Sequence, residues 1–138
     1  MSERELTLDL PGADLPGAGD PVITDVIAGA LASIDSALPG ASSQAAGALG
    51  IEAGAEQALL ILVDGLGYEL IQDHLGHTPT LRRVRDDIRS IHTVVPSTTA
   101  AAITAFGTGA RPGATNMVGF SVAYGGGVMN LLAMEGGP

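Results

Sequence analysis

The sequence predicts an α/β fold with a mostly parallel sheet and flanking helices. Residues 58–63 (ALLILV) form an unbroken aliphatic run of strand length, which is typical of a strand buried on both faces of a parallel sheet. Residues 90–95 (SIHTVV) are rich in β-branched side chains and stop at Pro96, which predicts a second strand. Helical patterns separate the two segments, so we expect a crossover connection and adjacent parallel strands.

The chain before residue 57 predicts one helix. Asp20 is a favourable N-cap, Pro21 suits the first helical position, and apolar residues recur at helical spacing as far as Pro39. Pro-Gly pairs predict a flexible leader, and a stretch rich in Ala, Gly and Ser after Pro39 predicts a linker. We therefore expect a flexible leader at 1–19, an N-terminal helix and small-residue linker at 20–56, and an incomplete α/β core at 57–138.

Shorter elements should follow the two strands. Gly and Pro punctuate the apolar pattern and delimit expected helices at 68–75, 78–84 and 100–106. Residues 121–132 are interrupted by three consecutive glycines, which predicts either a hairpin or a strand with a glycine bend.

Composition argues against several classes of function. The 138 residues include 15 acidic and 6 basic side chains, for a formal charge of −9, and no Trp. A nucleic-acid binder needs a basic surface and stacking side chains, and an anionic membrane would repel this chain. There is no cysteine, and hence no disulfide or thiolate metal site. The start lacks a secretory signal pattern, so we expect a cytoplasmic protein, and the oligomeric state stays open.

Polar residues follow both expected strands, at the edge where α/β sheets bind ligands. Asp64 lies between the aliphatic run and a Gly-Leu-Gly turn, where its carboxylate suits a metal ion or caps the next helix. Thr99 begins an Ala-rich helix, whose unpaired N–H groups suit a phosphate. Alternatively, Ser97 or Thr98 simply caps that helix.

Together the two clusters resemble the alkaline phosphatase superfamily, specifically its type I phosphodiesterase and nucleotide pyrophosphatase branch. The resemblance covers residues 57–120 and rests on LLILVDGLGYEL (59–70) and VVPSTTAAAITAFGTGARPGATNMVGF (94–120). The DGLG stretch is also similar to the start of cofactor-independent phosphoglycerate mutases, in the same superfamily. The stretch from Pro96 to Gly109 favours the phosphodiesterase branch.

The resemblance implies the N-terminal portion of an alkaline-phosphatase-like fold and the hydrolysis of a small-molecule phosphoester. It places a metal-binding aspartate at Asp64 and a metal-held threonine nucleophile at Thr99, served in the complete enzyme by two Zn²⁺ ions, with Mn²⁺ or Mg²⁺ as substitutes. Phe120 stands where diesterases have a phosphate-binding asparagine, so the resemblance does not choose between monoesters, diesters and pyrophosphates.

The same family needs further Asp and His ligands downstream of its nucleophile. After His92 the chain has no histidine, and Glu135 is its only acid after Asp87. His74 and His77 are three apart but separated by a glycine, and we expect them on the surface. We likewise expect His92 to be an ordinary strand side chain, Arg111 an exposed loop residue, and the arginines at 82, 83, 85 and 89 a solvated helix face.

We therefore expect an N-terminal fragment of a metal-dependent phosphoester hydrolase that is inactive by itself. Two alternatives remain open. One is a noncatalytic α/β module that binds phosphate or a nucleotide at its helix N-termini. The other is a nonfunctional fragment that associates through an open sheet edge.

Overall fold

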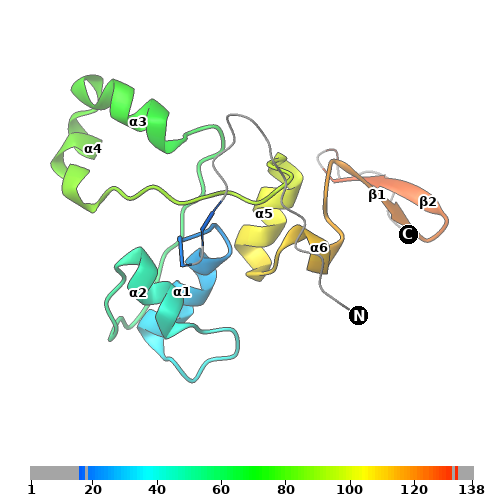
Figure 1. The fold of residues 1–138 in the computed structure, drawn as a ribbon, viewed down its shortest axis with the longest axis horizontal. Coiled ribbons are helices and arrows are strands. Elements are labelled where there is room, and N and C mark those ends of the chain that lie inside the picture. The colour runs from blue at the N-terminus through cyan, green and yellow to red at the C-terminus, as the bar shows by residue number, and fades with distance from the viewer. Residues whose placement is uncertain (1–15, 18, 132, 134–138) are drawn as a thin grey trace.

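The computed structural model describes residues 16–17, 19–131 and 133, which form a chain of short helices followed by one hairpin (Figure 1). The expected leader at 1–19 falls almost entirely outside the described residues. The elements are, in order, helices α1 (Asp25–Ile34), α2 (Ser43–Leu49), α3 (Tyr68–His74), η1 (Leu75–His77), α4 (Pro79–Arg83), η2 (Arg85–Asp87), α5 (Thr99–Thr108) and α6 (Pro112–Thr115), and strands β1 (Ser121–Tyr124) and β2 (Gly127–Asn130).

Helix α1 is shorter than the sequence predicts at both ends. Backbone hydrogen bonds join residues 21–23 to His92. The N–H of His92 donates to Pro21 O, and the carbonyl oxygen of His92 accepts from Ile23 N, both at 2.9 Å. The helix therefore starts at Asp25. The carboxylate of Asp25 accepts a hydrogen bond from Val22 N at 2.9 Å. At the other end Asp35 is extended, which stops the helix at Ile34.

Helix α2 lies where the sequence predicts a linker, and that prediction is wrong. Ser42 Oγ accepts from Ala45 N at 3.1 Å, which satisfies one N–H of the first turn. Gly50 ends the helix with φ of 68°, a left-handed conformation that glycine adopts without steric cost. These two caps and a run of alanines are enough to form a helix that carries almost no apolar periodicity.

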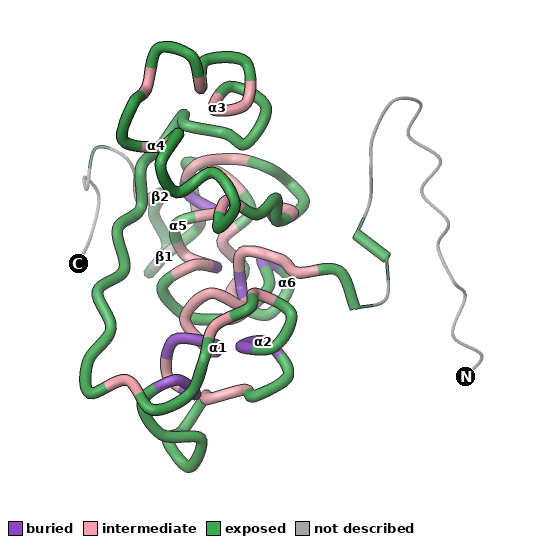
Figure 2. Tube along the Cα trace, turned by 90° about the vertical axis from the view of Figure 1, so that its left-hand side faces the viewer, coloured by how far each residue is buried: buried purple, intermediate pink, exposed green. Residues whose placement is uncertain are grey.

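Alanine forms the core between α1, α2 and α5. α1 contacts both α2 and α5, and the buried residues gather there in Figure 2. The close approach is visible at Gly29 of α1, where an added Cβ would lie 3.1 Å from Ala46 N. No side chain larger than valine is buried among the described hydrophobic residues, which are Ala30, Ala32, Ala45, Ala46, Val94, Ala100, Ala101 and Ala105.

Residues 57–63 form no strand, contrary to the sequence prediction. They run extended between α2 and α3, and none of their backbone groups hydrogen-bonds to another described residue (Figure 1). Their side chains are exposed, with 84% of Leu59, 75% of Ile61 and 56% of Val63 accessible to solvent. A strand exists only through pairing, because its backbone groups need partners on a neighbouring chain segment. In the described part of the protein this segment has no such neighbour.

The second expected strand, at 90–95, is reduced to one isolated parallel bridge between His92 and Val22. The two expected strands therefore do not pair with each other, and the prediction of a mostly parallel sheet is wrong. The only named sheet in the described chain is the antiparallel pair β1 and β2, in which Ser121 faces Asn130 and Tyr124 faces Gly127. The fold is a small α/β arrangement that is consistent with part of an alkaline-phosphatase-like fold.

Several local predictions are confirmed. Helices α3, α4 and α5 occur where the sequence places them, with ends that differ by a few residues. The hairpin alternative is correct at 121–130, because Gly125 and Gly126 adopt φ values of 55° and 84° and make the tight turn. No helix in the described ranges has both the length and the apolar character needed to cross a bilayer.

Candidate functional site

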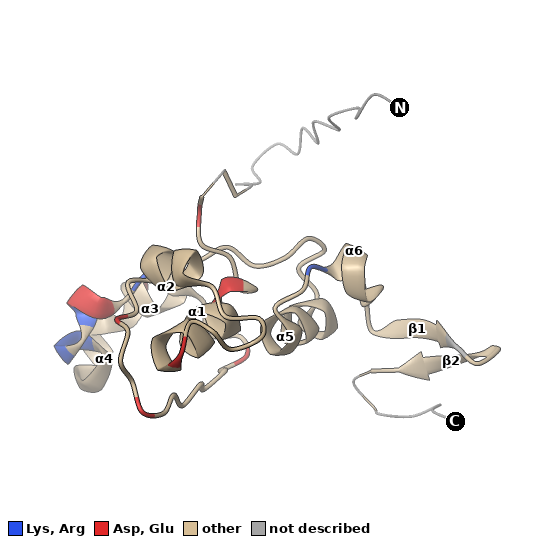
Figure 3. Cartoon of the chain, turned by 90° about the horizontal axis from the view of Figure 1, so that it is seen from below, with Lys and Arg blue, Asp and Glu red and all other residues tan. Residues whose placement is uncertain are grey.

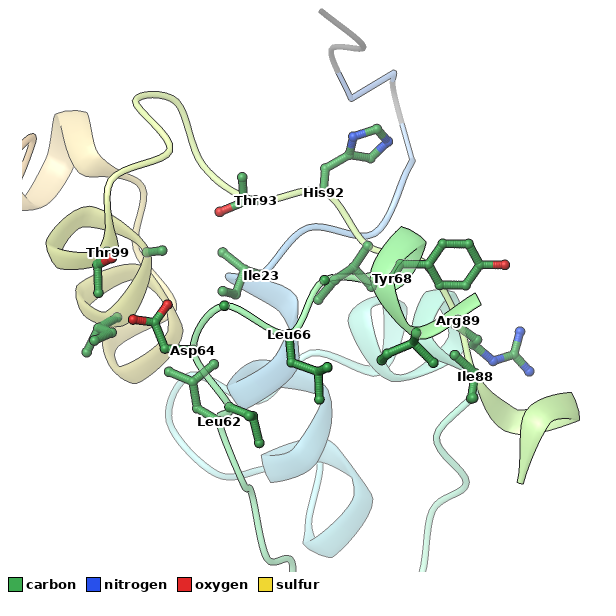
Figure 4. Close-up of a pocket in the computed structure, with 17 residues that line it drawn as sticks. Ile23, Leu62, Asp64, Leu66, Tyr68, Ile88, Arg89, His92, Thr93 and Thr99 are labelled. Atoms are coloured by element: carbon green, nitrogen blue, oxygen red, sulfur yellow. The ribbon is translucent and has the colours of Figure 1, made fainter. Parts of the chain in front are cut away.

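The candidate site is a cleft of about 480 Å³ between two extended segments and the start of α5. One wall is the turn that leads into α3, and the other is the segment at 88–93 that joins η2 to α5 (Figure 4). Aliphatic side chains form most of the surface, including Ile23, Leu62, Leu66, Ile71, Ile88, Ile91 and Ile103. The polar side chains among the lining residues are Asp64, Tyr68, Arg89, His92, Thr93 and Thr99.

Asp64 lies in the turn after the extended segment, and it does not cap a helix. Gly67 occupies the N-cap position of α3, with no side-chain cap, and its O accepts from Ile71 N at 3.1 Å. Gly65 makes the turn with φ of 74°. Asp64 is exposed, and its carboxylate has no hydrogen bond or ion pair within the described chain. The carboxylate is therefore available to a ligand.

Thr99 is the first residue of α5, and its neighbour Thr98 is the cap. Thr98 Oγ1 accepts from Ala101 N at 3.3 Å, as one of the sequence alternatives predicts. Thr99 Oγ1 makes no hydrogen bond to any described residue. It is partly buried at the positive end of the helix dipole. Capping by Thr98 thus leaves the Thr99 hydroxyl free to face the cleft.

The cleft brings Asp64 and Thr99 together, although 35 positions separate them in the sequence. Figure 4 shows the Asp64 carboxylate pointing toward the start of α5, where the Thr99 hydroxyl lies. Both groups are oxygen donors without partners in the described chain, and they occupy the same end of the cleft. Tyr68 and Arg89 lie at the other end of the view.

Arg89 is a cleft residue that the sequence analysis missed. It follows η2 and lies against Gly50, where an added Cβ would come within 2.6 Å of its Nη2 atom. Unlike Arg85, which pairs with Asp86 at 3.4 Å, Arg89 has no ion pair with a described residue. Nothing in the local sequence distinguishes Arg89 from Arg82 and Arg83, because its contact is with a residue far away in the chain.

His92 also lines the cleft, through its place in the bridge to Val22. Its Nε2 atom lies 3.8 Å from Oδ2 of Asp20, and Figure 4 shows the ring turned away from Asp64 and Thr99. The backbone of His92, through its hydrogen bonds to Pro21 and Ile23, holds the segment before α1 at the edge of the cleft.

The remaining candidates lie outside the cleft. His74 and His77 are exposed, as expected, with His74 Nδ1 2.9 Å from Leu70 O. Arg111 is an exposed residue before α6, also as expected. No group of three or more His, Cys, Asp or Glu side chains that could hold a metal ion occurs among the residues described.

One comparison with known proteins found a matching family. Residues 58–126 match the family described as type I phosphodiesterase / nucleotide pyrophosphatase. No match was found among curated proteins or among solved structures. The matched region is half of the chain and contains both Asp64 and Thr99. On the strength of this match, the chain belongs to the type I phosphodiesterase/nucleotide pyrophosphatase family.

Proposed function

We propose that this chain is part of a metal-dependent phosphoester hydrolase in which Thr99 is the nucleophile and Asp64 a metal ligand. The observation that carries the proposal is the pairing of these two groups in one cleft, each without a partner among the described residues. Gly67 and Thr98, rather than Asp64 and Thr99, occupy the cap positions of the following helices. A purely structural role therefore does not account for either group.

The reaction would take place in two displacements. The Thr99 hydroxyl gives its proton to solvent, and its oxygen bonds to the phosphorus while the bond to the leaving oxygen breaks and the leaving group departs with that electron pair. Water then bonds to the same phosphorus, the bond to the Thr99 oxygen breaks, and one proton of the water passes to that oxygen and restores the hydroxyl. The N-terminus of α5 stabilises the negative charge near Thr99 in both steps, because its free N–H groups and dipole favour anions.

A divalent metal fits the donors at this end of the cleft. The Asp64 carboxylate and the Thr99 hydroxyl are oxygen donors of the kind that Zn²⁺, Mn²⁺ and Mg²⁺ accept. A bound metal would supply Lewis acidity to the entering and leaving oxygens. Zinc sites use three or four protein ligands, and these two groups supply only part of such a set. We therefore propose that polypeptide beyond these 138 residues contributes the other ligands, and that this chain is an N-terminal fragment.

Acid-quenched labelling tests the role of Thr99. A longer protein that contains these residues is mixed with a phosphate ester and Zn²⁺, quenched in acid, digested and examined by mass spectrometry. The expected result is a phosphoryl or nucleotidyl group on Thr99 that is absent in Thr99→Ala and present in Thr98→Ala. Labelling at another residue, or labelling that survives Thr99→Ala, would contradict the proposal.

A further inference from the structure

The charge distribution in the cleft suggests a second anion-binding position. The whole chain carries a net charge of −9, and Asp64 adds a negative charge at the reacting end. A metal ion at Asp64 would balance the phosphoryl group that Thr99 attacks, but a second anionic group farther along the substrate would be repelled unless another cation in the cleft attracts it. Arg89 is the only Arg or Lys among the lining residues. Figure 3 shows the arginines of α4 at the edge of the molecule, far from α5.

The surroundings of Arg89 leave its guanidinium free to bind a ligand. It lies over the backbone of Gly50, at the C-terminal end of α2, and makes no hydrogen bond or ion pair with a described residue. A residue with a Cβ at position 50 would displace it, because that atom would lie within 3 Å of Cζ, Nε and Nη2. Within the described part of the chain all five N–H donors of the guanidinium are therefore unused, and their planar fork matches a phosphate.

We propose that Arg89 is a specificity-determining residue that binds a second anionic group of the substrate, remote from the phosphorus attacked by Thr99. Arg89 and Thr99 lie toward opposite ends of the cleft in Figure 4, with Leu66 between them and Ile88 beside Arg89. The substrate is therefore an elongated phosphoester with an apolar or aromatic part between its two anionic groups. The role of Arg89 in substrate specificity rests on the proposed function, whereas its ability to bind an anion does not.

Titration with inorganic phosphate, followed by ¹H–¹⁵N NMR without metal, tests the binding position in the 138-residue chain. We expect saturable shifts of the Gly50, Ile88 and Arg89 amides. Arg89→Gln should weaken binding about tenfold or more, because a charge-assisted hydrogen bond is lost. Arg89→Lys should weaken it less, because the charge remains while the fork is lost. Arg83→Gln, which removes the same charge from α4, is the matched control and should change the affinity less than about twofold.

The outcomes separate this inference from the proposed function. Thr99→Ala should bind phosphate at Arg89 as the unaltered chain does, whatever its effect on labelling. Arg89→Lys should retain part of the binding, which guards against a folding defect in Arg89→Gln. The inference is overturned if the unaltered chain shows no saturable shifts at Gly50, Ile88 and Arg89, whatever occurs at α4 or the start of α5, or if Arg83→Gln weakens binding as much as Arg89→Gln.

Discussion

Two adjacent threonines at the start of α5 have different surroundings. Thr98 Oγ1 satisfies the Ala101 N–H, whereas Thr99 Oγ1 has no partner in the described chain and lines the cleft. The sequence correctly offered Thr98 as a cap and left open whether Asp64 was one too. The structure decides the second question, since Gly67 holds the N-cap position of α3.

Substitution of each threonine should therefore affect a different property. Thr98→Ala should lower the free energy of unfolding by about 1 kcal/mol, because the helix loses its N-cap hydrogen bond. Thr99→Ala should change it by less than about 0.5 kcal/mol. Urea denaturation followed by circular dichroism measures both values. A larger loss of stability in Thr99→Ala than in Thr98→Ala would show that the two roles have been exchanged.

At the scale of elements, the contact between α1 and α2 depends on the absence of side chains. Gly29 packs against the backbone of Ala45 and Ala46, and Ser42 N donates to Ala28 O at 2.9 Å. The sequence shows helix α1 clearly, because it has an apolar stripe. The sequence contains little sign of α2, because only the caps and alanines of that helix mark it. The glycine against which α2 packs lies in α1. Local pattern thus predicts amphipathic helices well, and it predicts poorly those formed by small residues that pack closely.

Two glycines in this pair of helices offer a direct test of the packing. Gly29→Ala should destabilise the protein by about 1 kcal/mol, because the new Cβ presses on backbone atoms that cannot rotate away. Gly47→Ala, in α2, should stabilise it by about 0.5 to 1 kcal/mol, since nothing lies within 4 Å of the added Cβ and alanine favours a helix. Thermal denaturation of both variants distinguishes them. Equal stabilisation by the two substitutions would mean that α1 and α2 are not in close contact.

The extended segment at 57–63 gives a second test at this scale. Its amides make no hydrogen bonds within the described chain, so they should exchange with deuterium as fast as in an unstructured peptide. The amides of α1 and α5 should be protected in the same experiment. Protection at 57–63 would show that the segment is paired in solution, either with another copy or with residues outside the described ranges.

At the scale of the whole molecule, the core is small and the large aliphatic side chains are outside it. No residue larger than valine belongs to the buried hydrophobic set of the described chain, while Leu59 and Ile61 are largely exposed. The sequence predicted a parallel sheet because aliphatic runs usually serve as buried strands. That prediction requires neighbouring strands on both sides, and local composition carries no information on whether they are present. Asp64 and Thr99 do line one cleft, because a turn and a helix start are set by local residues, and their roles in metal binding and catalysis stay predictions.

The central claim is that Thr99 and Asp64 belong to a hydrolase whose metal site is completed elsewhere, and turnover tests it most directly. The 138-residue chain should hydrolyse p-nitrophenyl phosphate and bis-p-nitrophenyl phosphate only at the background rate, even with excess Zn²⁺ or Mn²⁺. Addition of the downstream residues should restore turnover, and either Thr99→Ala or Asp64→Asn should remove it again. Metal-dependent turnover by the 138-residue chain alone, or turnover by the longer protein that persists in Thr99→Ala, would contradict the account.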